Sequence, residues 1–308
     1  MNKMLPLAEQ LGLVYRGGWH LPAQRLWLTG QAPRNGLRFI GYAATLPRNH
    51  SKILCHSQLA ALWALQTRRV LPLPYAQPVQ LGTMALELLP SGIGRGAAML
   101  RLQTRNTTWI FVDGMRLDAL PAAEQLSWRE AEVLVVYAGP EQANSLNSAE
   151  LKDKLAKATQ ELWLLDDPTL ALDFASCRDG AEGVRFAPAL NALIKRANLT
   201  AAAPRPQMPR LAIWPALARA RVPAFAANWP SVHWRSPSAT PLELKGNGVE
   251  QLLFSRATSG EALAQCVLAS RIARVLALGP GAQALRDRCQ SAACEVEVLH
   301  DIEQLRLM

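Results

Sequence analysis

Short apolar runs separated by turn signals fill residues 1–140, and this alternation constrains the fold more than any other feature of the sequence. Runs of about four to eight residues, rich in branched and aromatic side chains and bounded by glycine, proline or asparagine, are typical of β-strands. The predicted strands span residues 25–28, 37–40, 52–54, 79–81, 85–89, 98–102, 108–112 and 133–137. A helix is predicted over residues 57–66, with Ser57 as its N-cap. The first half of the chain is therefore expected to be mostly β.

Beyond Pro140 the pattern changes to alternating helices and strands. Helices are predicted to begin at the N-cap Ser148 and to cover residues 169–176, 187–197, 260–272 and 282–289. Strands are predicted over residues 161–165, 211–214, 224–226, 232–234, 275–278 and 296–299, and a linker rich in proline and alanine over 200–207. This order is typical of an α/β architecture.

A chain of 308 residues, half of them hydrophobic, can bury the core of one large domain or of two interlocked ones. Charges interrupt every apolar run before it reaches the roughly 18 residues that span a bilayer, so no membrane partner is expected. The N-terminus lacks the apolar core of a secretory signal, which makes the expected location cytoplasmic. The five cysteines are odd in number and scattered, so neither a disulfide framework nor a metal site at Cys289 and Cys294 is expected.

The net charge of +9 and the isoelectric point of about 9.7 indicate a polyanionic partner. Residues 184–242 contain eight basic side chains and no acidic one, with tryptophans interleaved among them. Cations that clamp phosphates and aromatic rings that stack bases are typical of nucleic-acid binding. The candidate binding residues are Arg95, Lys195, Arg196, Arg210, Arg219, Arg221, Trp229, Trp234 and Arg235. Two other interpretations stay open: the cations merely keep the protein in solution, and the tryptophans fill the core.

Motifs with possible chemistry have structural explanations. Gly92, Gly94 and Gly96 resemble a phosphate-binding loop, but a strand rather than a helix follows them, which favours a tight turn in a hairpin. Asp166 and Asp167 could form a carboxylate pair, yet adjacent side chains in a turn diverge, and Asp167 is well placed to cap the next helix. The histidines share no metal-binding spacing, and no nucleophile motif is found. The sequence therefore predicts no catalytic residue, no metal and no cofactor.

Framework segments along nearly the whole chain resemble one known family. These segments are KILCHSQLAALW (52–63), LPYAQPVQLG (73–82), LLPSGIGRGAA (88–98), NAL (191–193), AFAANW (224–229) and LKGN (244–247). In this order they resemble the bacterial mRNA 3′-end processing factor-like, or DNA ligase-associated, exonucleases of the metallo-β-lactamase and β-CASP fold. The resemblance implies a metallo-β-lactamase-like αββα sandwich, formed by residues 1–144 and 223–308, with a β-CASP-like α/β domain inserted over residues 145–222.

Other residues stand where this family carries its metal ligands and conserved acids. The resemblance assigns these positions to Tyr42, Ala44, Leu46, Pro47, Ile93, Gly114, Tyr137 and Asn247. Only Asp113, one place out of register, is close to an expected acid. A two-metal hydrolytic centre needs several deprotonated ligands, which these side chains do not supply. Because Tyr42, Leu46 and Ile93 are bulky, the centre is interpreted as replaced by core.

These observations predict a catalytically inactive, nuclease-like subunit that binds nucleic acid, scaffolds an active nucleic-acid-processing partner, or both. The expected partners are DNA or RNA and an active nuclease, ligase or helicase. Inactive members that pair with active nucleases occur elsewhere in this fold group, so this prediction rests on analogy. Two alternatives stay open: an active nuclease or hydrolase with a relocated catalytic site, and a purely protein-binding adaptor.

Overall fold

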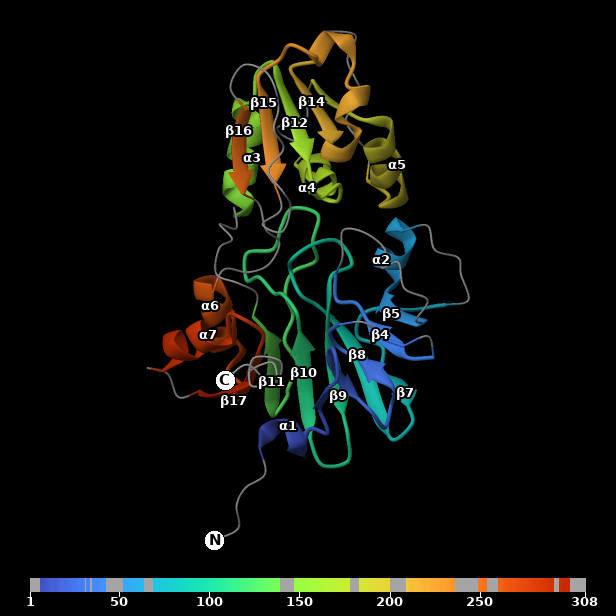
Figure 1. Cartoon of the computed structure of the whole chain (residues 1–308), viewed down its shortest axis with the longest axis vertical. Helices are drawn as coiled ribbons and strands as arrows, with labels where there is room; N and C mark the ends of the chain where they lie inside the picture. The colour runs from blue at the N-terminus through green and yellow to red at the C-terminus, as the bar shows by residue number, and fades with distance from the viewer. Residues whose placement is uncertain are drawn as a thin grey trace. The chain divides into compact units, whose positions relative to one another are not determined.

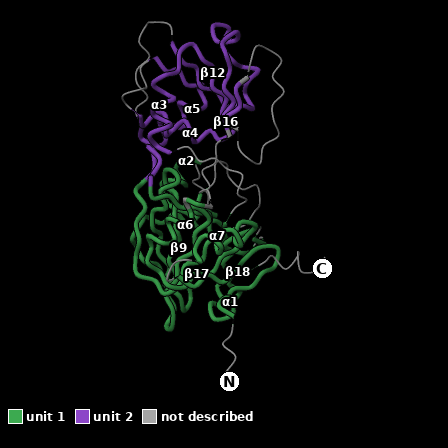
Figure 2. The backbone as a smooth tube through the Cα atoms, turned by 90° about the vertical axis from the view of Figure 1, so that its left-hand side faces the viewer, with its two compact units in different colours: residues 1–117, 124–141, 257–308 green, residues 118–123, 142–256 purple. Residues whose placement is uncertain are grey.

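A computed structural model describes residues 6–30, 32–33, 35–42, 52–63, 69–138, 147–177, 183–199, 209–235, 249–253, 260–290 and 294–299. The chain forms two compact units, drawn in green and purple in Figure 2. Unit 1 comprises Met1–Leu117, Glu124–Glu141 and Ala257–Met308, and unit 2 comprises Asp118–Ala123 and Gln142–Arg256. Each unit combines helices with strands, which confirms the predicted α/β class.

The boundary of unit 2 differs from the predicted insertion over residues 145–222. Strands β15 (Ser231–Arg235) and β16 (Val249–Leu253) pair within the sheet of unit 2, so residues 223–256 belong to that unit. The chain then returns to unit 1, where β17 (Arg274–Leu278) pairs with β11 (Val133–Tyr137). The predicted boundary was wrong because sequence periodicity identifies a strand but not the sheet that it joins.

The first sheet of unit 1 has six strands in the order β1-β2-β3-β4-β5-β6. They are β1 Val14–Tyr15, β2 Trp19–Leu21, β3 Leu26–Trp27, β4 Leu37–Phe39, β5 Lys52–His56 and β6 Val70–Leu73. Because β3 to β6 are parallel, these four strands start at one edge of the sheet and end at the opposite edge. Helix α1 (Leu7–Gln10) precedes the sheet, and α2 (Ser57–Leu62) follows β5. The N-cap of α2 is His56, whose side chain accepts a hydrogen bond from the Gln58 N–H, and not the predicted Ser57.

The second sheet has seven strands in the order β18-β17-β11-β10-β9-β8-β7. Its further strands are β7 Val79–Leu81, β8 Met84–Pro90, β9 Ala98–Gln103, β10 Thr108–Val112 and β18 Glu295–Leu299. Strands β7 to β10 are antiparallel neighbours, whereas β10, β11, β17 and β18 are parallel. The glycine-rich residues 91–97 connect the antiparallel strands β8 and β9, so the predicted hairpin turn is confirmed.

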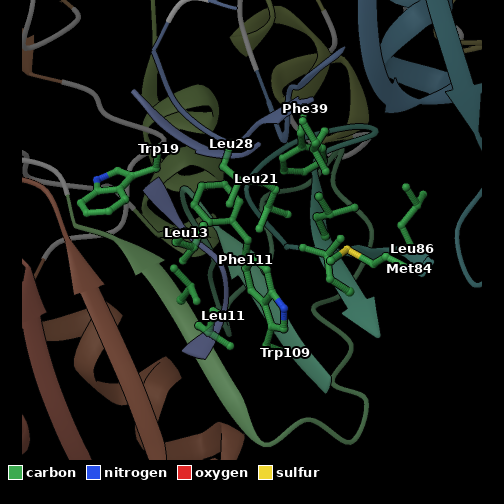
Figure 3. Packing of buried hydrophobic residues seen from close by; sticks show 14 of the residues in the cluster. Leu11, Leu13, Trp19, Leu21, Leu28, Phe39, Met84, Leu86, Trp109 and Phe111 are labelled. Atoms are coloured by element: carbon green, nitrogen blue, oxygen red, sulfur yellow. The ribbon is translucent and has the colours of Figure 1, made fainter. Parts of the chain in front are cut away.

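The main core of unit 1 lies between these two sheets (Figure 3). Leu21 and Phe39 of the first sheet pack in one cluster with Leu86, Trp109 and Phe111 of the second. The rings of Phe39 and Phe111 meet edge to face, with their centroids 6.0 Å apart. Burying each such side chain contributes roughly 1.5–3 kcal/mol. This contact holds β4 against β10. The residues that directly follow these two strands form part of the candidate site described below.

Two C-terminal helices, α6 (Gly260–Ser270) and α7 (Ala282–Cys289), cover the other face of the second sheet (Figure 1). Ile110 packs there with Leu263 of α6 and Leu285 of α7. Its neighbours along β10 face the first sheet, because successive strand residues point to opposite faces. Both faces of β10 are therefore buried.

Unit 2 is built on five parallel strands in the order β13-β14-β12-β15-β16. Its further elements are α3 Ser148–Lys157, β12 Glu161–Leu165, α4 Leu170–Ser176, β13 Val184–Phe186, α5 Pro188–Arg196, β14 Leu211–Pro215 and the 3-10 helices η2 Ala216–Arg221 and η3 Ala224–Ala226. A capping box between Asn147 and Glu150 starts α3, so Asn147 rather than the predicted Ser148 is the N-cap. The chain leaves β12 toward β13 and leaves β15 in the opposite direction toward β16. The C-terminal ends of β12 and β15 therefore flank a topological switch point.

Two other expectations can be compared with the structure, and a third concerns residues that it does not describe. Residues 224–226 form η3 and not a strand, because the Ala226 N–H bonds to the nearby Pro223 carbonyl instead of to a partner strand. The linker predicted over 200–207 lies outside the described residues. All five cysteines are free thiols, as expected. Within the part of the chain that the structure describes, no helix combines the length and the apolar character needed to cross a bilayer.

Candidate functional site

The described positions that the resemblance assigns to the metal centre lie where several strands of unit 1 end. Gly41 and Tyr42 follow β4, Asp113 and Gly114 follow β10, and Tyr137 ends β11. Strands β10 and β11 are parallel neighbours and end side by side. The residues after β4 also lie beside the end of β10, since a Cβ atom on Gly41 would lie 2.6 Å from Asp113 Oδ1. The fold thus brings together segments that are far apart in the sequence.

Ile93 and Gly114 pack against each other at this edge. Ile93 lies in the loop between β8 and β9, and its side chain is only 5% exposed. Its Cδ1 atom would be 3.2 Å from a Cβ atom on Gly114, which is tighter than an ordinary van der Waals contact. An acidic side chain at position 114 would therefore require Ile93 to move. The Ile93 side chain therefore occupies space that a side chain at position 114 would need.

Asp113, the carboxylate beside these positions, has an environment that disfavours its charge. Its Oδ1 atom is buried and accepts no hydrogen bond from any described residue. Burial raises the pKa of Asp113 to about 6, although a backbone hydrogen bond and the charge of Arg38 oppose that rise. Burial also lowers the pKa of Arg38, against the opposing effect of Asp113. The two charges therefore compensate each other only in part.

The remaining assigned positions divide into described and undescribed residues. Tyr42 and Tyr137 are half-buried. The Tyr137 ring packs against Gly279, where a Cβ atom would lie 2.9 Å from Cε2. The positions outside the described residues are Ala44, Leu46, Pro47 and Asn247. Among the residues that are described, no group of three or more histidine, cysteine, aspartate or glutamate side chains could hold a metal ion.

A polar cluster beside the glycine-rich loop was not predicted from the sequence. The His56 ring stacks on the Tyr75 ring with a centroid distance of 3.6 Å. Both the Tyr75 hydroxyl and the Gly96 N–H donate hydrogen bonds to Glu124 Oε2, at 3.4 and 3.1 Å. Burial, and then the charge of Arg95, lower the pKa of His56 to about 4, so this imidazole is neutral and a weak base at pH 7. Burial, and then Glu124, raise the pKa of Tyr75. The cluster therefore serves to hold the loop.

Several of the basic candidates for nucleic-acid binding are exposed on unit 2. Lys195 and Arg196 end α5, which packs against α4, whereas Arg219 and Arg221 lie on η2, which contacts β12 and β14. Arg95 belongs to unit 1, where it is half-buried in the loop between β8 and β9. These cations thus come from two helices of unit 2 and one loop of unit 1, and each of the two helices carries an exposed pair.

Two candidates have structural roles that correct the prediction. Trp234 is 1% exposed, and its ring packs against Trp163 and Phe174 with centroid distances of 5.1 and 5.3 Å. It cannot stack a base, because alternate side chains of a buried central strand face the core. The Arg210 guanidinium donates hydrogen bonds to the carbonyls of Leu155 and Ala158, so it braces the end of α3.

The remaining two candidates are less constrained by the structure. Trp229 is half-buried, with its ring 5.5 Å from that of Phe225. Arg235 ends β15, but its side chain lies outside the described part of the chain.

An aspartate–histidine pair at the topological switch point of unit 2 was not predicted from the sequence. His233 Nε2 lies 3.0 Å from Asp166 Oδ1, and the His233 side chain is fully buried. The two residues are 67 positions apart, so no local spacing could reveal them. Asp167 is not the N-cap of α4, which is Thr169, but its carboxylate accepts hydrogen bonds from the backbone N–H and the hydroxyl of that residue.

Comparisons with known proteins show that this chain is similar in fold to a solved structure. No protein-family model matches the chain, and none of the curated proteins matches it. A solved structure that resembles it is a protein of unknown function from Enterococcus faecalis V583. The alignment has a TM-score of 0.58 at 13% sequence identity and covers 95% of this chain and 83% of the other. The chain therefore shares an overall fold with that protein across most of both lengths.

Proposed function

We propose that this chain is a non-catalytic relative of the metallo-β-lactamase and β-CASP nucleases, which binds nucleic acid and scaffolds an active processing partner. The arrangement of unit 1 supports the fold assignment: two facing sheets enclose the core, and helices cover the outer face of one of them. An α/β unit with a parallel sheet interrupts unit 1, as the resemblance implies. The family name itself rests on the resemblance of framework segments.

The packing of Ile93 against Gly114 is the main observation that supports a non-catalytic assignment. A two-metal hydrolytic centre needs carboxylates and imidazoles that hold two dications and generate hydroxide. The described residues at this edge do not fit such a centre, because Ile93 has no donor atom in its side chain and Gly114 has no side chain. Asp113 is a single carboxylate, and it points toward the backbone of Gly41, where burial favours its neutral form.

Metal content tests this part of the proposal directly. Protein purified without chelators is expected to hold less than one zinc, manganese or iron ion per chain, as measured by inductively coupled plasma mass spectrometry. One or more ions per chain would overturn the non-catalytic assignment. Ile93→His, which restores a donor at one assigned position, serves as a comparison and is not expected to create a site alone, since several ligands are required.

Nucleic-acid binding is supported by the net charge of +9 and by the exposed cations of unit 2. Each phosphate contact contributes a salt dependence of roughly −0.7 to −0.9 in the slope of log K against log salt. Arg219 and Arg221 are the best residues to test, because both are exposed on one short element.

Fluorescence anisotropy with labelled single- and double-stranded oligonucleotides measures this binding. The wild type is expected to bind with weak sequence preference, and affinity should fall with salt. Arg219→Glu/Arg221→Glu should weaken binding to all sequences and reduce the salt slope by roughly 1.4–1.8. The matched control Arg16→Glu/Arg105→Glu makes the same charge change on exposed turn residues of unit 1. Equal weakening by both variants would show non-specific attraction, and no binding at low salt would favour the purely protein-binding adaptor.

A relocated hydrolytic centre is the second candidate, and the Asp166–His233 pair favours it. Ligands of open parallel sheets bind beside a topological switch point, and a carboxylate can orient a histidine for proton transfer. Incubation of labelled oligonucleotides with wild type and with His233→Gln tests this candidate. Cleavage by the wild type that the variant loses, with both proteins folded, would replace the scaffolding proposal.

A further inference from the structure

A basic hollow lies at the edge of unit 1 where the parallel strands of the first sheet begin. It has a volume of about 420 Å³ and is lined by Gln24, Arg25, Asn35, Leu37, Lys52, Arg69, Val70, Leu71 and Leu81. This volume falls within the range of roughly 300–1,000 Å³ typical of small-molecule sites. Among the lining residues that the structure describes, three are cationic and none is acidic.

The fold gathers these cations from distant parts of the sequence. Arg25 directly precedes β3, Lys52 is the first residue of β5, and Arg69 directly precedes β6. Strands β3 to β6 are parallel, so the residues that start them meet at one edge. Register confirms the alignment, because Leu37 at the start of β4 pairs with Lys52. The positions assigned to the metal centre follow the opposite ends of these strands, so this hollow is a separate feature.

The backbone at Arg25 is held in an unusual conformation. Its φ angle is 51°, in the left-handed region that few residues other than glycine adopt. The Arg25 N–H donates to the Pro22 carbonyl, and the Arg25 carbonyl accepts a hydrogen bond from the Leu37 N–H. Both backbone groups thus fix the point from which this side chain reaches the hollow.

The rest of the lining defines the kind of molecule that fits. Leu37, Val70 and Leu71 give apolar surface from the first sheet, and Leu81 adds apolar surface from β7 of the second. Figure 1 shows β4, β5 and β7 in the same region of unit 1. The side-chain amides of Gln24 and Asn35 can both donate and accept hydrogen bonds. Cations, amides and apolar surface together match an anion with an organic body.

We propose that this hollow binds a phosphate monoester of nucleotide size, either as a free nucleotide or as the 5′-terminal nucleotide of a strand. The guanidinium groups of Arg25 and Arg69 and the ammonium group of Lys52 contact the phosphate oxygens. Arginine presents a planar fork of donors to phosphate, and lysine adds a compact charge. The leucine and valine side chains cover the organic part, and the amides contact its polar edge.

Isothermal titration calorimetry with adenosine 5′-monophosphate and with adenosine tests the dependence on phosphate. The monophosphate is expected to bind at least about tenfold more tightly, because charge-assisted hydrogen bonds form only with phosphate. The same comparison between 5′-phosphorylated and unphosphorylated thymidine dinucleotide distinguishes the two sources. Binding of the monophosphate alone assigns a free nucleotide, whereas tight binding of only the phosphorylated dinucleotide assigns a strand end. Both results support the site.

The triple variant Arg25→Gln/Lys52→Gln/Arg69→Gln should weaken binding of the phosphate ester by at least about tenfold while the protein stays folded in a thermal melt. A matched control, Arg16→Gln/Arg105→Gln/Arg271→Gln, removes three exposed arginines from turns of the same unit, including one with a φ angle of 56°. The control should bind as the wild type does.

Three outcomes would overturn the site: adenosine binding as tightly as its monophosphate, no binding of either phosphate ester, or equal weakening by the control. The result is independent of the proposed function, which relies on Arg219 and Arg221 of unit 2. Unphosphorylated oligonucleotides report on those residues, and the monophosphate reports on the hollow.

Discussion

Replacing Asp113 by asparagine should stabilise unit 1 at neutral pH. The Oδ1 atom of Asp113 is buried without a hydrogen-bond donor among the described residues, and burial raises the pKa of the carboxyl to about 6 from an ordinary value of 3.8. In the folded protein the carboxyl therefore holds its proton more tightly than in the unfolded chain. Wild-type stability should fall as the pH rises from about 4 to about 6 and stay lower above that range.

The size of this effect follows from the shift in pKa. A difference of roughly two pH units corresponds to about 3 kcal/mol at pH 7, since one unit is worth about 1.4 kcal/mol. Asparagine has nearly the same shape, carries no charge and can accept the same backbone hydrogen bond. It loses the attraction of Arg38, which is smaller than the effect of burial. The expected gain in unfolding free energy is thus about 1–3 kcal/mol at pH 8 and close to zero at pH 4.

Thermal unfolding of Asp113→Asn and wild type across pH 4–8 measures this gain. A change of 1 kcal/mol shifts the melting temperature of a domain of this size by about 2–4 °C, so the variant should melt several degrees higher at pH 8. The difference should grow between about pH 4 and about pH 6 and level off above that range. Asp287→Asn, which removes an exposed carboxylate of the same unit, should show no such growth.

Two results would refute the reasoning. A melting difference that is the same at every pH would mean that burial does not disfavour the charge of Asp113. A variant that melts lower than the wild type at pH 8, but not at pH 4, would mean that the ionised carboxylate is stabilised by a cation. That second result would also count against the non-catalytic assignment.

Three further predictions concern the packing around the candidate sites. The His56 ring should show no titration between pH 5 and 8 in an NMR experiment, because burial and then Arg95 lower its pKa to about 4. Trp234→Ala should reduce the unfolding free energy of unit 2 by about 3–5 kcal/mol, measured by denaturant titration, whereas Trp229→Ala should cost less because that ring is half-buried. Gly96→Ala should lower the melting temperature more than Gly82→Ala does. Both glycines have positive φ, but only at position 96 would the new Cβ atom lie 2.6 Å from a backbone nitrogen of α2. Equal losses would show that backbone strain alone sets the cost.

The central strands could be predicted from the sequence with little error. β10 and β11 occur over the predicted residues 108–112 and 133–137, because a run of apolar residues bounded by turn signals is a local property. The hairpin turn at the glycine-rich loop was also predicted, since the need for positive φ is local. The short strands β1, β2, β6, β13 and β16 were missed. β1, β2 and β13 have only two or three residues, Pro72 interrupts β6, and Glu250 and Gln251 interrupt β16, so none of these strands forms a continuous apolar run.

The candidate sites depended far more on tertiary structure. The sequence showed that side chains unsuited to bind metal stand at the assigned positions, but only the fold put Ile93 against Gly114. Trp234 was a candidate for nucleic-acid binding with a core position left open, and the pairing of β15 with β12 places that ring in the core.

Long-range pairing explains what the sequence left undecided. Asp166 meets His233 across two neighbouring parallel strands, and the basic hollow collects residues that start β3, β5 and β6. Parallel strands are joined by long crossovers, so residues that share an edge are far apart along the chain. Residue type and periodicity determined which segments become strands and where charge accumulates. Strand order and register, which are set by packing of the whole core, decided which side chains meet.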